Sequence, residues 1–247
     1  MTSKFAIAGT ALLLQSGIAH SAEIKVLSTQ ATEEAYRELV PQFEKATGHK
    51  VVTVFTGTLD ANKRLAAGET YDLLIMASDA IDGHIKGGKV AGGRIDLAKS
   101  GVALGVKTGA PKPDIGSVEA LKTTVLAAKS IGYATGPSGI YMVSLFEKLG
   151  LTEALKPKLK QTTSGVFVGT LIASGEAEIG FQQVSELIHF PGVDYVGPLP
   201  AEVQRYTTFS SGVIAGTAHA DAAKALAAFI SAPTAVQAYK KRGMEPG

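Results

Sequence analysis

GYATGPSGIY, residues 132–141, decides the fold predicted for this chain. A short apolar segment, residues 130–133, leads into a turn with two glycines and a proline, and a helical pattern follows. The apolar residues then recur at helical spacing: Ile140, Val143, Leu145, Phe146 and Leu149. Free N–H groups in the first turn of a helix attract anions, Gly136 and Gly139 allow close approach, and Ser138 can cap the helix or donate its hydroxyl. Most strand–turn–helix junctions bind nothing, so this junction alone is weak evidence for a binding site. The evidence is stronger because the chain contains several such junctions, each rich in hydroxyl groups.

Composition excludes several classes of protein. The 247 residues include 24 Lys and Arg against 22 Asp and Glu, with neither Cys nor Trp. Without cysteine there are no disulfides, thiolate metal sites or cysteine nucleophiles. The charge is nearly balanced and no aromatic residues alternate with basic runs, so nucleic-acid binding is not expected.

The first residues have the pattern of an export signal. Lys4 precedes an apolar run, residues 5–14, and small residues follow at 19–22. This pattern predicts a signal peptide over residues 1–22, cleaved after Ala22, and a periplasmic protein. The run is too short for a permanent membrane anchor, and the alternative is a buried N-terminal strand.

Apolar strands alternate with amphipathic helices through the rest of the chain. The expected strands are the apolar runs 24–27, 51–55, 71–76, 101–106, 130–133 and 178–183. The first two end at small hydroxyl-bearing residues, Ser28-Thr29 and Thr56-Gly57-Thr58. Strand 71–76 is almost wholly apolar, which is typical of a parallel strand buried on both faces. The alternation predicts an α/β fold with parallel sheets.

Two segments are expected to connect two lobes. The proline-containing segment 107–117 has the composition of a boundary, and the long apolar strand 206–217 can return the chain to the first lobe. The prediction is a first lobe from residues 23–103 and 208–247, and a second from residues 104–207.

These features, in this order, resemble the type 2 periplasmic solute-binding proteins, in their molybdate-binding branch. The motifs that carry the resemblance are FTGT (55–58), LAAG (65–68), DLLIMAS (72–78), PSGIY (137–141), KLG (148–150) and AEIG (177–180). The resemblance covers nearly the whole mature chain. It implies a two-lobed α/β fold with two hinge-crossing strands and a small anion held between the lobes.

The resemblance also implies a ligand shell of uncharged donors. Carried onto this sequence, it consists of Ser28, Thr29, Thr56, Gly57, Thr58, Thr135, Ser138, Gly139, Ser164, Gly165 and Val166, the last three at the start of a helix expected from residue 163. Fixed N–H and O–H donors can hold a desolvated anion without a mobile counter-charge. Each of these hydroxyls could instead be an ordinary helix cap.

One departure from the family pattern concerns the ligand. Molybdate binders usually place a tyrosine just after the late strand, where this chain has Gln182 and Gln183. Amides both donate and accept, which favours a larger ligand with carboxylates and hydroxyls. Lys63 and Arg64 could reach a multiply charged ligand, although an exposed helix face is the favoured explanation for both.

The resemblance extends to a branch that includes an enzyme, which interconverts trans- and cis-aconitate. That allylic proton shift needs a base and donors for the developing charge, and the resemblance implies no metal or organic cofactor. Candidate proton carriers are Glu186, His189 and Tyr141. The alternative is the substrate-binding component of an ABC transporter for molybdate or another small anion, with a membrane permease as partner. A monomer is expected in either case, and a structural or adhesion module is a third possibility.

Overall fold

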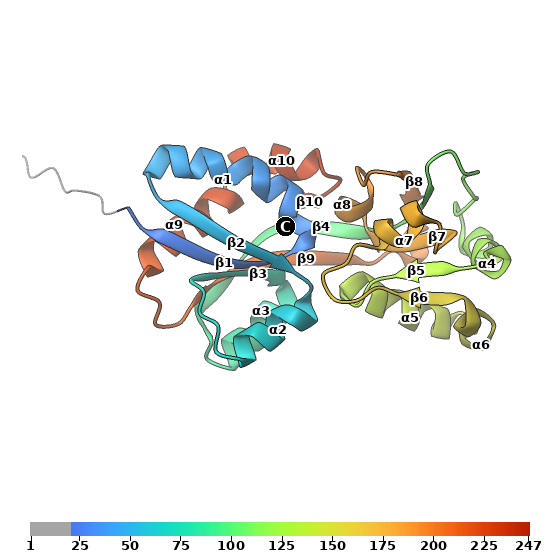
Figure 1. Ribbon diagram of the computed structural model, residues 1–247, viewed down its shortest axis with the longest axis horizontal. Helices are drawn as coiled ribbons and strands as arrows, with labels where there is room; N and C mark the ends of the chain where they lie inside the picture. The colour runs from blue at the N-terminus through green and yellow to red at the C-terminus, as the bar shows by residue number, and fades with distance from the viewer. Residues whose placement is uncertain (1–20) are drawn as a thin grey trace, which may run out of the picture.

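The computed structural model describes residues 21–247, so nearly all of the predicted signal peptide lies outside the described residues. The molecule is elongated, with two α/β lobes side by side along its long axis (Figure 1). The predicted α/β fold with two lobes and two crossing strands is confirmed. No helix within residues 21–247 is long and apolar enough to cross a membrane.

The first lobe is built on a sheet with strand order β2-β1-β3-β9-β4. Three strands are parallel, namely β1 (Glu23–Thr29), β2 (Lys50–Thr56) and β3 (Leu73–Ala77), whereas β9 (Tyr206–Ile214) runs antiparallel to β3 and to β4 (Val90–Lys107). The short β10 (Glu245–Pro246) also pairs with β4. Strand β3 is completely buried, as its apolar sequence predicts.

Helices cover both faces of this sheet (Figure 1). One face carries α1 (Glu33–Thr47), which η1 (Gln30–Thr32) precedes, with α9 (Ala220–Ser231) and α10 (Val236–Lys240). The opposite face carries α2 (Thr58–Ala66) and α3 (Ser78–Lys86). Each face buries its own apolar cluster, so the sheet is enclosed on both sides.

The second lobe continues the same sheet. Strand β7 (Ile179–Gln183) pairs antiparallel with the last third of β4, and β5 (Ile131–Tyr133) and β6 (Leu159–Gln161) follow in parallel. Strand β8 (Val193–Pro198) pairs with β4. One apolar cluster gathers α4 (Val118–Ala127), α5 (Pro137–Lys148) and α6 (Thr152–Leu155), and another gathers α7 (Val168–Ser174) and α8 (Val184–Leu187).

The lobes are joined within continuous strands. Strand β4 pairs with β9 as far as Gly101 and with β7 from Val102 onward, and β9 begins opposite Gly101. The expected boundary segment 107–117 lies instead within the second lobe, where the N–H of Thr108 donates to the carbonyl of Gly192 (3.0 Å). Strand β4 is continuous where it passes from one lobe to the other, so its composition does not change there. The proline-containing segment 107–117 does differ in composition, and it was therefore predicted as the boundary. The boundaries 103/104 and 207/208 stay a prediction.

Candidate functional site

A small cavity of about 40 Å³ lies between the lobes. It is found where β1, β2, β5 and β7 end, at the carboxyl edges of strands from both lobes, which is where ligands bind in open α/β sheets. The residues that line it are Thr29, Gln30, Ala31, Thr56, Gly57, Thr58, Ala134, Thr135, Gly136, Pro137, Ser138, Thr162, Gly165, Val166, Gln182, Gln183, Glu186 and Phe209.

Two hydroxyls in this cavity are buried without a hydrogen-bond partner. They belong to Thr29, the last residue of β1, and Thr162, which directly follows β6. Their Oγ1 atoms find no partner among residues 21–247. An unpaired buried hydroxyl is unfavourable by about 1–3 kcal/mol. A bound ligand that hydrogen-bonds to both hydroxyls would remove this cost. One hydroxyl comes from each lobe, so a guest that bonds both would hold the lobes together.

Glu186 is the one acidic side chain that lines the cavity. It is partly buried at α8, and burial raises the pKa of its carboxyl to about 7. Nearby Glu33 raises this pKa further, whereas hydrogen bonds from the Gln182 side chain and the Gln183 backbone lower it. Glu186 can therefore exist in both protonation states at neutral pH, as a group that accepts and returns a proton must.

The two glutamines at the end of β7 have structural partners. The Oε1 atom of Gln182 accepts from the N–H of Val168 (2.7 Å), at the first turn of α7. The amide of Gln183 donates to the carbonyl of Ser100 (2.9 Å) and accepts from the hydroxyl of Thr207 (3.0 Å), so it ties β4 to β9 where they cross. The sequence suggested ligand contacts for both side chains; the structure shows that both also fix the backbone around the cavity.

Loop contacts close the cavity from both sides. The Nε2 atom of Gln30 donates to the carbonyl of Gly165 (2.8 Å), and the N–H of Asp60 donates to the hydroxyl of Ser164 (3.2 Å). A Cβ atom on Gly57 would lie 2.4 Å from Ser164 Oγ and 2.8 Å from the N atom of Gly165. Only glycine at position 57 allows the lobes to approach this closely.

Of the predicted ligand shell and candidate catalytic residues, many line the cavity: Thr29, Thr56, Gly57, Thr58, Thr135, Ser138, Gly165, Val166, Gln182, Gln183 and Glu186. The hydroxyl of Thr56 donates to the Asp60 carboxylate (2.8 Å) and so already has a partner. The helix expected from residue 163 begins only at Val168, and Gly165 lies in a turn with φ +82°.

Three members of the predicted shell of uncharged donors lie outside the lining. Ser28 is completely buried, and its hydroxyl donates to the carbonyl of Thr29 (3.0 Å). Gly139 is required by packing, because a Cβ there would lie 1.7 Å from the carbonyl oxygen of Ala134. Ser164 accepts the interlobe bond from Asp60 described above. These residues support the cavity without lining it.

The predicted basic residues also lie elsewhere. Lys63 is exposed on α2. Arg64 pairs with Asp60 (3.0 Å) and Glu69 (3.3 Å). Both residues therefore lie on an outer face of helix α2, as the alternative explanation predicted, and neither lines the cavity.

Two of the candidate proton carriers also lie outside the cavity lining. The hydroxyl of Tyr141 donates to the carbonyl of Val203 (2.5 Å), within the second lobe. His189 is exposed and contacts the carbonyl of Lys241 (3.0 Å). Among the three candidates, Glu186 alone lines the cavity.

Thr162 was missed by the sequence prediction. It lies in the run Gln161-Thr162-Thr163-Ser164, directly after the short strand β6. The rule that picked the strand ends at Thr29 and Thr56 would have found it, but β6 is only three residues long and has little apolar pattern.

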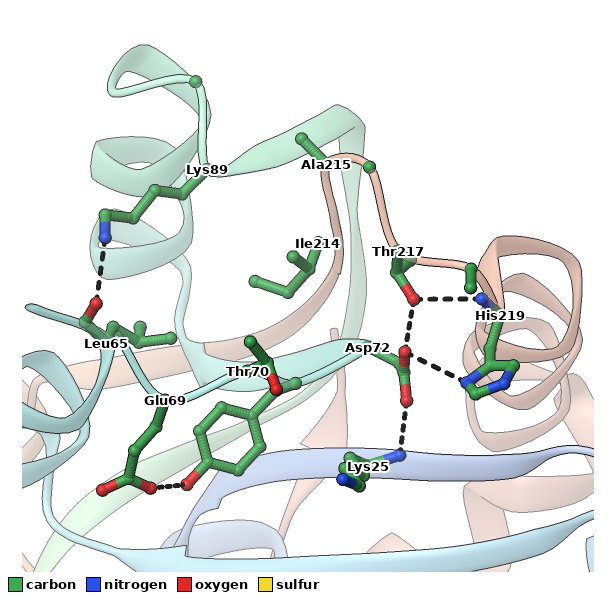
Figure 2. Close-up of a pocket in the computed structure, with 14 residues that line it drawn as sticks. Lys25, Leu65, Glu69, Thr70, Asp72, Lys89, Ile214, Ala215, Thr217 and His219 are labelled. Atoms are coloured by element: carbon green, nitrogen blue, oxygen red, sulfur yellow. Dashed lines mark hydrogen bonds and ion pairs between the residues drawn. The ribbon is translucent and has the colours of Figure 1, made fainter. Parts of the chain in front are cut away.

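A far larger cavity, about 590 Å³, lies within the first lobe near the amino ends of β1 and β3 (Figure 2). Most of its polar groups pair with one another. Asp72 accepts from the N–H of Lys25 (2.7 Å) and from the Thr217 hydroxyl, and lies 3.4 Å from His219 Nδ1. The hydroxyl of Tyr71 donates to Glu69 (2.6 Å). Since these groups are already satisfied, we place the candidate site between the lobes.

A metal is not suggested by the geometry. Within residues 21–247, no group of three or more His, Asp or Glu side chains is arranged to hold a metal ion. The cavity offers hydroxyls, backbone N–H groups, amides and one carboxyl, a set that suits anion binding and proton transfer.

Comparison with known proteins gives a consistent result. A family model described as bacterial extracellular solute-binding protein matches residues 24–245. The chain is 35% identical over 230 residues to an aconitate isomerase of a Pseudomonas species, covering 90% of this chain and 87% of that one. It is 33% identical over 172 residues to the molybdate-binding protein ModA of Azotobacter vinelandii, covering 68% of each.

The fold comparison agrees with the sequence comparison. The periplasmic molybdate-binding protein of Azotobacter vinelandii superposes with a TM-score of 0.76 at 20% identity, covering 90% of this chain and 98% of that one. At this identity, the similarity shows a shared fold.

Proposed function

We propose that this chain, which belongs to the bacterial extracellular solute-binding proteins in their ModA-like branch, uses the binding fold for catalysis. The proposed reaction is the interconversion of trans- and cis-aconitate by an allylic proton shift in the interlobe cavity. The observation that carries this proposal is Glu186, a carboxyl in the cavity with a pKa of about 7. The similarity to an aconitate isomerase over 90% of the chain supports it.

The chemistry assigns a role to each kind of group in the cavity. The Glu186 carboxylate takes a proton from the methylene carbon of the bound tricarboxylate, and the C–H electron pair becomes part of the new double bond. The electrons of the old double bond then take a proton from the neutral Glu186 carboxyl at the former vinyl carbon, which returns Glu186 to its ionised form. The hydroxyls of Thr29 and Thr162 and the N–H groups of the neighbouring turns stabilise the negative charge that develops on the substrate carboxylate.

The competing proposal is a receptor for molybdate or another small anion, which would deliver its ligand to an ABC permease. The molybdate-binding relatives and the small closed cavity favour it. An ionised carboxyl repels a bound molybdate and a bound tricarboxylate alike, so this repulsion does not separate the two functions. What favours the isomerase is that only this reaction needs a group that takes up and returns a proton.

Turnover separates the two functions. The mature protein is incubated with trans-aconitate, and cis-aconitate is followed by chromatography. Ligand-induced shifts of the melting temperature are measured in parallel with aconitate, molybdate and tungstate. We expect turnover together with stabilisation by aconitate. Absence of turnover combined with tight molybdate or tungstate binding would establish the receptor instead, and the absence of any shift would favour a structural module.

The cellular setting follows from the same family. We propose export to the periplasm, with cleavage after Ala22, and a monomeric protein that needs no cofactor. Mass spectrometry of the protein recovered from the periplasm tests the cleavage site, and light scattering tests the oligomeric state.

A further inference from the structure

A second groove, about 310 Å³, adjoins the interlobe cavity. Gln30, Glu33 and Glu34 line it from the first lobe, and Ser185, Glu186 and His189 line it from the second. The groove therefore follows the same junction between the lobes as the cavity, at the start of α1 and at α8.

Two residues, Gln30 and Glu186, line both spaces. Gln30 is held by its bond to the carbonyl of Gly165 and so belongs to the contacts that close the cavity. Glu186 lines both spaces from the other lobe. The partition between cavity and groove thus contains the one carboxyl that the proposed reaction uses.

The groove suits protons and water better than it suits the substrate. Three carboxyl groups line it, and among its described lining residues there is neither lysine nor arginine. Two of its carboxyls are paired with cations that do not line the groove, Glu33 with Arg37 (2.6 Å) and Glu34 with Arg242 (4.0 Å). A tricarboxylate would be repelled by these carboxyl groups and would find no free lysine or arginine there, so the groove is unfavourable as a path for the substrate.

Ser185 adds a polar group next to Glu186. Its hydroxyl is buried and has no partner within residues 21–247. Such a group is commonly satisfied by water, and both Ser185 and Glu186 line the groove, so a water bonded to Ser185 would lie close to the space that Glu186 borders.

We propose that Glu186 exchanges its proton with solvent through this groove, so that the hydrogen placed on the product comes partly from water. The inference rests on the proposed isomerisation. After taking the substrate proton, the neutral Glu186 carboxyl passes it to water in the groove and receives another, which it delivers to the vinyl carbon. One proton leaves and one enters, and water is the only co-reactant.

Turnover in D₂O tests the route. Cis-aconitate is collected at low conversion, and its deuterium content is measured by NMR. We expect deuterium in a substantial fraction of the product molecules, and Ser185→Ala should lower that fraction at least about two-fold relative to turnover. The matched control Ser231→Ala, on the surface helix α9, should leave it unchanged. Normal turnover with hydrogen derived only from the substrate would overturn the inference while leaving the proposed function intact.

A second measurement does not depend on turnover. Infrared difference spectra of the wild type and Glu186→Gln identify the carboxyl band of Glu186 near neutral pH. On transfer to D₂O, we expect this band to shift within seconds, and more slowly in Ser185→Ala. A band that stays unshifted for hours would overturn the solvent route, even if the protein turns out not to isomerise aconitate.

Discussion

Two cavities of this protein differ in size and in the pairing of their polar groups, and the smaller one has more polar groups without partners. The larger one, within the first lobe, contains polar groups that pair with one another, with Asp72 bonded to Lys25 and Thr217. The smaller one, between the lobes, contains the unpaired hydroxyls of Thr29 and Thr162 and the weakly acidic Glu186. Volume alone therefore does not identify the functional site. Polar groups left without partners mark the place where a guest completes the structure.

The largest expected effect tests the carboxyl that distinguishes the small cavity. Glu186→Gln keeps the size of the side chain and removes the proton carrier, so aconitate turnover should fall by roughly 10²–10⁴-fold, the usual contribution of general acid–base catalysis. Steady-state kinetics measure this fall. Glu153→Gln, an exposed glutamate of α6 in the same lobe, is the matched control and should keep full activity. Unaltered turnover in Glu186→Gln would show that another group carries the proton.

The pH dependence of stability probes the same carboxyl in the absence of ligand. Its pKa is raised from 4.5 to about 7 in the folded protein, so the folded state binds the proton more tightly than the unfolded state. The stabilisation is fully present below pH 4.5 and is lost as pH rises through about 7, by roughly 3 kcal/mol in total. Urea unfolding of the wild type and Glu186→Gln across this range measures the difference. Parallel pH profiles of the two proteins would contradict the raised pKa.

Hydroxyl substitutions compare the two cavities directly. Thr29→Val or Thr162→Val should weaken aconitate binding by about 1–3 kcal/mol without lowering the free energy of unfolding, since neither hydroxyl has a partner in the free protein. Thr217→Val should do the reverse, because it removes a donor from buried Asp72 and leaves ligand binding alone. Calorimetry and urea unfolding measure both quantities. Loss of aconitate affinity in Thr217→Val would move the site to the larger cavity.

The smallest expected effect concerns closure of the lobes. Gly57→Ala brings a methyl group against Ser164 and Gly165, so the closed form should be destabilised by about 1–2 kcal/mol and ligand affinity should fall by roughly 5–30-fold. Small-angle scattering with saturating ligand should show a more open molecule than the wild type. Gly83→Ala, where an added Cβ meets nothing within 4 Å, is the matched control. Equal affinity in Gly57→Ala and the wild type would mean that ligand binding does not need these contacts.

Several features of the site follow from rules that are local in sequence. Thr29 and Thr56 end apolar strands, so their place at the carboxyl edge of the sheet could be predicted. Ser28 shows the limit of that rule. Neighbouring residues of a strand point to opposite faces, and a choice between Ser28 and Thr29 needs the register of β1 against β2 and β3.

The alternation of apolar strands and amphipathic helices was enough to determine the α/β class and, with the ordered motifs, the two-lobed family, because both depend on patterns within short stretches of chain. Only the tertiary structure decided which polar groups remain without partners. The contacts that settle this question join residues far apart in the chain, such as Gln30 with Gly165 and Gln182 with Val168. The raised pKa of Glu186 has the same origin, since burial depends on how the two lobes meet and not on the residues beside it in the sequence.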